Sequence, residues 1–145
     1  MEYLGFLAGK DGLKVNPPKL KSIMDFPVPT KVRDVQAFLG LVGYFRIFVK
    51  KFAEKAKPLY KLLKQAIPWK WEAEQQDAFD ILKSDLIQAP VLAFPDFSKP
   101  FILTTDASGY AIGAMLSQIQ NGFERLIACN SRVLTDCETR YNNTD

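Results

Sequence analysis

The chain has 145 residues, 48% of them hydrophobic, so it is long enough for one ordinary globular domain or two small ones rather than a disordered protein. It contains no histidine, which excludes Ser-His-Asp and Cys-His catalysis and Cys/His zinc sites and leaves carboxylate, lysine or metal-carboxylate chemistry. The net charge of +3 divides into +9 for residues 1–70 and −6 for residues 71–145, so the first half either attracts phosphate groups or is a solvated lysine-rich surface.

The first third of the chain predicts a β-ribbon followed by helices. Residues 1–16 are apolar with turn residues at Gly9 to Gly12, which favours a short hairpin. Pro17 and the proline after it predict the start of a short helix that runs to about Phe26. Thr30 is then the predicted N-cap of the next helix.

The clearest helix is predicted from Lys31 to about Val49. Its buried face is formed by apolar residues at spacings of three and four, namely Val32, Val35, Phe38, Leu39, Val42, Phe45 and Val49. The opposite face carries Gln36, Gly40 and Tyr44 at four-residue spacing, with Gly43 beside them. Each interior glycine costs a helix roughly 1 kcal/mol, so close approach of a partner is expected here. That partner is either another helix or a nucleic acid.

Two more helices are predicted, from Phe52 to about Lys64 with an interruption at Pro58, and from about Ala73 to Gln88. The two tryptophans between them are expected to anchor the core rather than to form a stacking platform. Three prolines spaced five residues apart then mark residues 90–100 as a linker.

Three antiparallel strands are predicted after the linker, at 101–105, 111–117 and 123–129. Asn121 and Gly122 between the last two strands are the strongest signal for a two-residue hairpin. A single carboxylate, Asp106, follows the first strand, where an aspartate either ligates a metal or caps a turn. No helix is predicted to cover this sheet, so its apolar face is expected to be exposed.

Cys129 and Cys137 fall in no metal-binding pattern and are expected to be free thiols in a reducing compartment. The N-terminus lacks the pattern of a signal peptide, and no segment is long and apolar enough to span a bilayer. We therefore expect an intracellular protein, in the cytoplasm or nucleus, that is not secreted and has no membrane partner.

Short motifs along nearly the whole chain resemble the Pol polyprotein of gypsy-type LTR retrotransposons. They occur in the order of that family: Phe38-Leu-Gly-Leu-Val-Gly-Tyr-Phe-Arg-Ile-Phe-Val49, Ala56-Lys-Pro-Leu59, Trp69-Lys-Trp71, Ala78-Phe79, Leu82-Lys83, Ala89-Pro-Val-Leu92, Pro95-Asp96, Thr105-Asp-Ala-Ser108 and Ile112-Gly-Ala-Met-Leu-Ser-Gln118. The resemblance implies an α+β fold, with a small helical thumb subdomain followed by an incomplete RNase H-like mixed sheet.

The resemblance also divides the chain into parts with separate roles. Residues 1–16 would be the end of the reverse transcriptase palm with a primer-grip-like hairpin, 17–89 the thumb, 90–100 a linker and 101–145 the first part of RNase H. The nucleic-acid-binding residues implied in this way are Leu4, Gly5, Phe6, Gln36, Gly40, Gly43, Tyr44 and Arg46. The expected partner is a template-primer duplex or RNA·DNA hybrid, recognised by backbone and shape.

Asp106 resembles the first catalytic carboxylate of RNase H, and Asp145 matches the position of the second, where the family has a longer glutamate. Such enzymes hold two Mg²⁺ ions with several carboxylates. The polymerase aspartates and the later RNase H carboxylates have no counterpart in the chain. We therefore expect catalytic and metal-binding roles for Asp106 and Asp145 in a parent enzyme, and no tight Mg²⁺ binding by this chain.

Three functions remain open after this comparison. The chain is a fragment of a retrotransposon-derived reverse transcriptase and ribonuclease H, working with the remainder of a Pol polyprotein and inactive on its own. Alternatively, it is a host-retained module that binds nucleic acid without catalysis, or one that binds proteins through the uncovered sheet.

Overall fold

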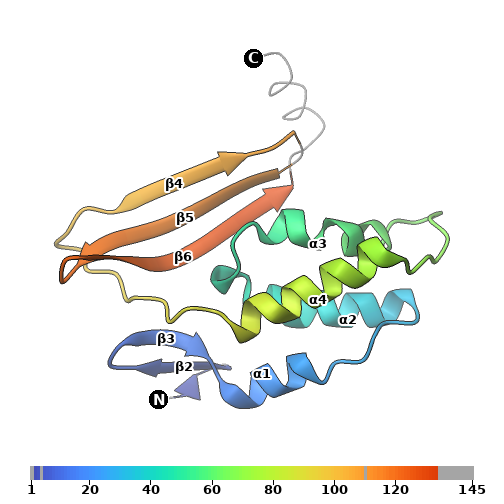
Figure 1. The fold of residues 1–145 in the computed structure, drawn as a ribbon, viewed down its shortest axis with the longest axis horizontal. Coiled ribbons are helices and arrows are strands. Elements are labelled where there is room, and N and C mark those ends of the chain that lie inside the picture. Colours follow the sequence, from blue (N-terminus) through green and yellow to red (C-terminus); the bar gives the residue numbers. More distant parts are fainter. Residues whose placement is uncertain (1, 4, 110, 134–145) are drawn as a thin grey trace.

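The computed structural model describes residues 2–3, 5–109 and 111–133, which form two antiparallel sheets and a group of helices (Figure 1). The predicted α+β class is confirmed. In chain order the elements are β1 (Glu2–Tyr3), β2 (Phe6–Gly9), β3 (Gly12–Val15), α1 (Pro17–Met24), α2 (Val32–Gly43), the 3₁₀ helix η1 (Arg46–Phe48), α3 (Phe52–Lys61), α4 (Ala73–Ile87), β4 (Ile102–Ala107), β5 (Ala111–Gln120) and β6 (Phe123–Val133).

The first sheet is the predicted hairpin, with β2 and β3 joined at a tight turn and β1 added beside β2. Gly12 has φ +137°, and a Cβ built there would lie 2.0 Å from the carbonyl oxygen of Leu92. Only glycine fits at this position. The backbone of Leu92 lies this close because it exchanges two 2.8 Å hydrogen bonds with the backbone of Leu13, the residue after Gly12. The linker segment is thus bonded to the hairpin.

Helix α2 ends at Gly43, six residues before the predicted end, and the chain continues into η1. The periodic pattern persists because a 3₁₀ turn also places residues three apart on one side. Phe45, Phe48 and Val49 are accordingly all buried in the core. At the other end the N-cap residue is Lys31, so the predicted cap at Thr30 is wrong. The N–H and hydroxyl of Thr30 instead both donate to the carboxylate of Asp34.

Helix α3 continues through Pro58, so the predicted interruption there is wrong. Ala56 and Leu59 on either side of the proline are fully buried in the core, and this packing offsets the missing backbone hydrogen bond. Helix α4 has the expected bounds to within a residue. Trp71 packs edge-on against Phe79 of α4, as expected for a core anchor. Trp69 is exposed and stacks on the ring of Trp71, so its predicted role as a core anchor is wrong.

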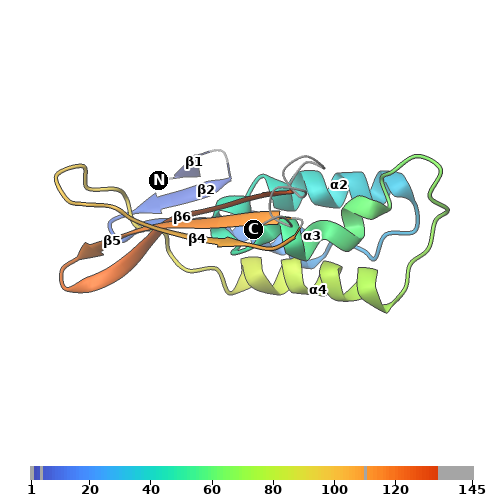
Figure 2. The ribbon, with the colours of Figure 1, turned by 90° about the horizontal axis from the view of Figure 1, so that it is seen from above.

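The second sheet has the order β4-β5-β6, and both strand pairs are antiparallel. Asn121 and Gly122 have φ values of 53° and 84°, as the predicted two-residue hairpin requires. The β5–β6 hairpin extends away from the helices, while the other end of the sheet lies against α3 (Figure 2). Leu103 on β4 is 66% exposed, in line with the expected uncovered face.

The segment between α4 and β4 connects the two sheets as well as the two halves of the chain. Leu92 is buried beside the first hairpin, and the N–H of Ala93 donates to the carbonyl of Leu126 on β6 at 2.7 Å. Among the described residues, no helix is long and apolar enough to cross a membrane.

Candidate nucleic-acid interface

A groove of about 450 Å³ lies between the turn that joins β1 to β2, the start of α1, and helix α2 with the residues that follow it. It is lined by Gly5, Lys19, Gly40, Leu41, Tyr44 and Phe45. The groove therefore brings together a residue of the predicted primer-grip-like hairpin, Gly5, and two residues of the predicted contact strip of α2, Gly40 and Tyr44. Sequence reasoning placed these residues in two separate sites, and in the fold they form one surface.

Aromatic packing fixes the hairpin against α2. The ring of Phe6 stacks on that of Tyr44 with centroids 5.3 Å apart, and it contacts Phe45 edge-on at the same distance. Gly5 precedes Phe6 with φ +87°, a conformation that favours glycine. This conformation lets the chain turn toward α2 while the backbone of Gly5 stays at the floor of the groove.

The strip on α2 is open to solvent. Gln36, Gly40 and Tyr44 are all exposed, and a Cβ built at Gly40 would meet no atom within 4 Å. No described helix therefore packs on Gly40, so close packing against another described helix does not explain why position 40 is a glycine. Gly43 differs, because a Cβ there would lie 4.0 Å from the ring of Phe52 on α3.

Arg46 points away from the groove. Its guanidinium donates to the carbonyl of Ser131 on β6 and lies over the ring of Phe52, 5.1 Å from the centroid. Its Nε is buried and has no hydrogen-bond partner in the part of the chain that the structure describes. Arg46 therefore links α3 to the second sheet. Its contact with nucleic acid stays a prediction. Leu4 lies outside the described residues.

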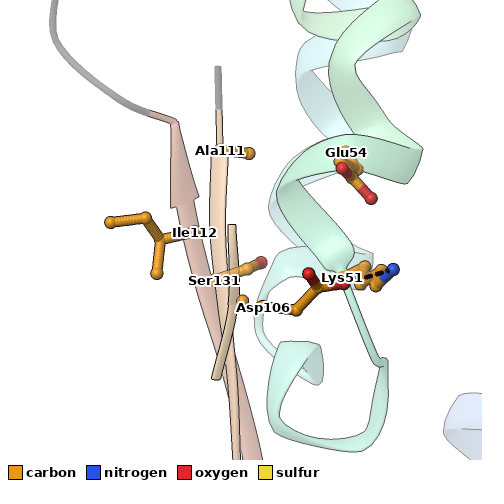
Figure 3. Close-up of a pocket in the computed structure, with 7 residues that line it drawn as sticks. Lys51, Glu54, Asp106, Ala111, Ile112 and Ser131 are labelled. Atoms are coloured by element: carbon orange, nitrogen blue, oxygen red, sulfur yellow. Dashed lines mark ion pairs between the residues drawn. The ribbon is translucent and has the colours of Figure 1, made fainter. Parts of the chain in front are cut away.

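The candidate catalytic carboxylate is in a different place, where β4 faces the start of α3 (Figure 3). Asp106 pairs with Gly113 on β5, and its carboxylate lies 2.7 Å from the ammonium nitrogen of Lys51. The hydrogen bond from Lys51 and the charge of its ammonium hold the pKa of Asp106 below its ordinary value. The same contact raises the pKa of Lys51.

Lys51 is held in position by the way α3 begins. It is the N-cap residue of α3 with φ 55°, in the left-handed region, and its side chain does not cap the helix. The cap comes instead from β6, where the hydroxyl of Ser131 accepts the N–H of Ala53 at 2.8 Å. Sequence reasoning did not find Lys51 or this use of Ser131, because nothing in the local pattern pairs residues so far apart.

The described residues do not form a site for two metal ions. No three aspartate, glutamate or cysteine side chains gather anywhere in the described part of the chain, and Asp145 lies outside it. At Asp106 the ammonium of Lys51 contacts the carboxylate, and Glu54 lines the same depression (Figure 3). In the turn after β4 the hydroxyl of Ser108 accepts the N–H of Ala111 at 3.2 Å, and the N–H of Ser108 donates to the carbonyl of Ala111.

Residues 71–145 match the model of the RNase H-like domain found in reverse transcriptase. The chain belongs to this family. The resemblance to gypsy-type Pol polyproteins is also confirmed, because the chain is 45% identical to the Retrovirus-related Pol polyprotein from transposon 297 of Drosophila melanogaster over 97% of its length. The corresponding polyprotein from transposon gypsy is 43% identical over 97% of the chain, and the Gag-Pol polyprotein of Gibbon ape leukemia virus is 39% identical over 91%.

The RNase H-like chain spans only a small part of these relatives, 13% of the transposon 297 polyprotein and 14% of the gypsy polyprotein. Among solved structures, the foamy viral protease-reverse transcriptase in complex with double-stranded DNA superposes with a TM-score of 0.81 at 27% identity, over 97% of this chain and 25% of that one. The same viral protein in complex with an RNA/DNA hybrid gives a TM-score of 0.79 at 27% identity, over 97% and 19%.

Proposed function

We propose that this chain is a segment of a retroelement Pol polyprotein that binds a nucleic-acid duplex in the groove lined by Gly5, Lys19, Gly40 and Tyr44. The observation that carries the proposal is the exposed surface of Gln36, Gly40 and Tyr44, which continues into the backbone of Gly5. A helix face without bulk beside an exposed aromatic ring suits the close approach of a sugar-phosphate backbone.

The comparisons support the same partner. The foamy viral protein was captured with double-stranded DNA and with an RNA/DNA hybrid, and this chain aligns with it over nearly its whole length. Template-primer duplex and RNA·DNA hybrid are therefore the ligands we propose. In the parent polyprotein the segment would contribute to RNA-directed DNA polymerase and hybrid ribonuclease activities, together with the remaining parts of Pol.

We further propose that the 145-residue chain does not cleave RNA·DNA hybrids by itself. The support is the ion pair between Lys51 and Asp106, in which the carboxylate is already neutralised by a cation of the protein. The parent family uses divalent metal ions, and Mg²⁺ bound at Asp106 and Asp145 stays a prediction about that parent enzyme.

Gly40→Leu tests the binding function directly. A Cβ at Gly40 would meet no described atom within 4 Å, and leucine favours a helix over glycine, so the fold should keep its stability while the groove is blocked. We expect affinity for a 20-base-pair RNA·DNA hybrid, measured by fluorescence anisotropy, to fall about tenfold, because a loss of about 1.4 kcal/mol is a modest steric penalty in an interface.

Gly9→Leu is the matched control for this test. Gly9 is also an exposed glycine with no atom near a built Cβ, but it lies at the hairpin turn outside the groove. Its substitution should leave the affinity within about twofold, far less than the tenfold effect expected in the groove. Equal affinity of wild type and Gly40→Leu would rule out binding at this groove.

A further inference from the structure

Lys19 is the cation of the groove, although no sequence motif singles it out. It lies in the first turn of α1 and lines the groove together with Gly40 and Tyr44. The other lining residues are glycine, aliphatic or aromatic, and none is acidic. With the described side chains Lys19 forms no ion pair, whereas Lys21 on the same helix pairs with Asp25 at 3.5 Å.

The backbone holds Lys19 beside the hairpin. The carbonyl of Asn16 accepts the N–H of Lys19 at 2.9 Å, and the N–H of Asn16 donates to the carbonyl of Gly5 at 2.9 Å. Pro17 and Pro18 occupy the first helical positions between them, where fixed φ angles suit the start of a helix. The α-carbon of Lys19 is therefore held close to Gly5 by short hydrogen-bonded connections.

The bare α-carbon of Gly5 makes room for the lysine side chain. A Cβ built at Gly5 would lie 3.5 Å from Cγ and 3.6 Å from Cε of Lys19, and 3.2 Å from the ring of Phe45. The aliphatic stem of Lys19 thus runs along the backbone of Gly5 and Cε, which carries the ammonium group, stays next to it. Lysines commonly bury the stem in this way while the ammonium remains hydrated.

We infer that Lys19 contacts a backbone phosphate of the nucleic-acid strand lying in the groove, an inference that rests on the proposed binding function. The lysine ammonium is a point charge suited to a single phosphate, and it reads no base. Gly5 then has a second role, since it admits both the lysine stem and the strand. Lys19 is a binding residue for either type of duplex.

The salt dependence of binding by Lys19→Met tests this contact. Removing one phosphate contact should reduce the slope of log affinity against log salt by about 1 and weaken binding about fivefold at 0.1 M salt. Lys21→Met removes the same charge two residues away, outside the groove, and should change neither quantity appreciably. Lys19→Arg keeps the cation and should restore most of the affinity.

Backbone neutralisation gives a second, more local readout. Single uncharged methylphosphonate linkages are placed in turn along the primer strand of the hybrid. For wild type we expect one linkage at which neutralisation weakens binding about fivefold, and for Lys19→Met we expect that linkage to have no effect. A Lys19→Met protein that remains as sensitive as wild type at that linkage would overturn the direct contact.

The outcomes separate this inference from the proposed function. If Gly40→Leu weakens binding but Lys19→Met behaves like Lys21→Met, the groove binds duplex and the lysine contact is wrong. If neither Gly40→Leu nor Lys19→Met changes affinity, the groove function itself is wrong.

Discussion

The groove and the Asp106 site differ in whether their charged side chain has a counterion among the described residues. In the groove, the lysine has no described acidic neighbour and the helix face beside it is bare. At Asp106 the carboxylate and the ammonium of Lys51 are in contact, and residues from both the sheet and α3 line the depression beside them. A phosphate of a nucleic-acid backbone can therefore serve as the counterion of Lys19 in the groove. Asp106 already has its counterion, Lys51, within the chain.

The largest effect is expected when a carboxylate is introduced into the groove, because this makes the groove resemble the Asp106 site. Gly40→Glu would place an acidic side chain beside Lys19 and in the path of the phosphates. We expect affinity for the hybrid to fall roughly 100-fold at low salt, because like charges brought together cost several kcal/mol. Raising the salt should recover part of this loss, unlike that of Gly40→Leu. Anisotropy titrations at several salt concentrations would measure both effects.

A smaller effect is expected where the second sheet holds the helices. Ser131→Ala removes the hydroxyl that accepts the N–H of Ala53 at the start of α3. Loss of such a cap costs about 1 kcal/mol of unfolding free energy, which chemical denaturation can measure. Ser98→Ala, at an exposed hydroxyl bonded only locally to Asp96, is the control. A Ser131→Ala protein as stable as this control would show that the cap contributes nothing.

The smallest effect concerns the ion pair itself, and it is best followed by pH. Lys51→Met should return the lowered pKa of Asp106 toward the ordinary value of about 3.9, as NMR titration of the carboxyl group would report. Because the folded-state pKa is lowered, the pair stabilises the fold at pH values above the ordinary aspartate range. That contribution is lost as pH falls through the lowered pKa.

The melting temperatures of wild type and Lys51→Met should therefore differ slightly near neutral pH and converge in acid. Lys50→Met, at the neighbouring lysine, is the control for the loss of one positive charge. An unchanged Asp106 titration in Lys51→Met would contradict the assignment of Lys51 as the cause of the pKa shift.

Local patterns predicted most of the fold. The hairpin turn at Asn121 and Gly122 was predictable because only certain residues tolerate the required φ angles. The bounds of α4 followed from its apolar spacing. The end of α2 was not predictable, because the 3₁₀ turn preserves the same spacing of buried residues as a continued helix. Pro58 was misleading for a related reason, since tertiary packing outweighs its local cost.

The sites were predictable to different degrees. The bare strip of Gly40 and Tyr44 is a property of one helix and is visible in the sequence. Its junction with Gly5 and Lys19 depends on how the hairpin folds back, so it required the structure. The pair of Lys51 and Asp106 joins residues 55 positions apart, and no periodicity reports such a contact. Asp106 was thus recognised as a notable carboxylate, but its neighbour was not.

The cap supplied by Ser131 has a consequence for how the chain reaches this structure. During synthesis Ala53 leaves the ribosome 78 positions before Ser131, the serine that completes the start of α3. Until Ser131 is made, the N–H of Ala53 lacks the hydroxyl that accepts its hydrogen bond. The guanidinium of Arg46 likewise lacks the carbonyl of Ser131 to which it donates. A chain truncated before β6 should therefore keep its groove residues but hold α3 less firmly, so the last described strand stabilises a helix that is made long before it.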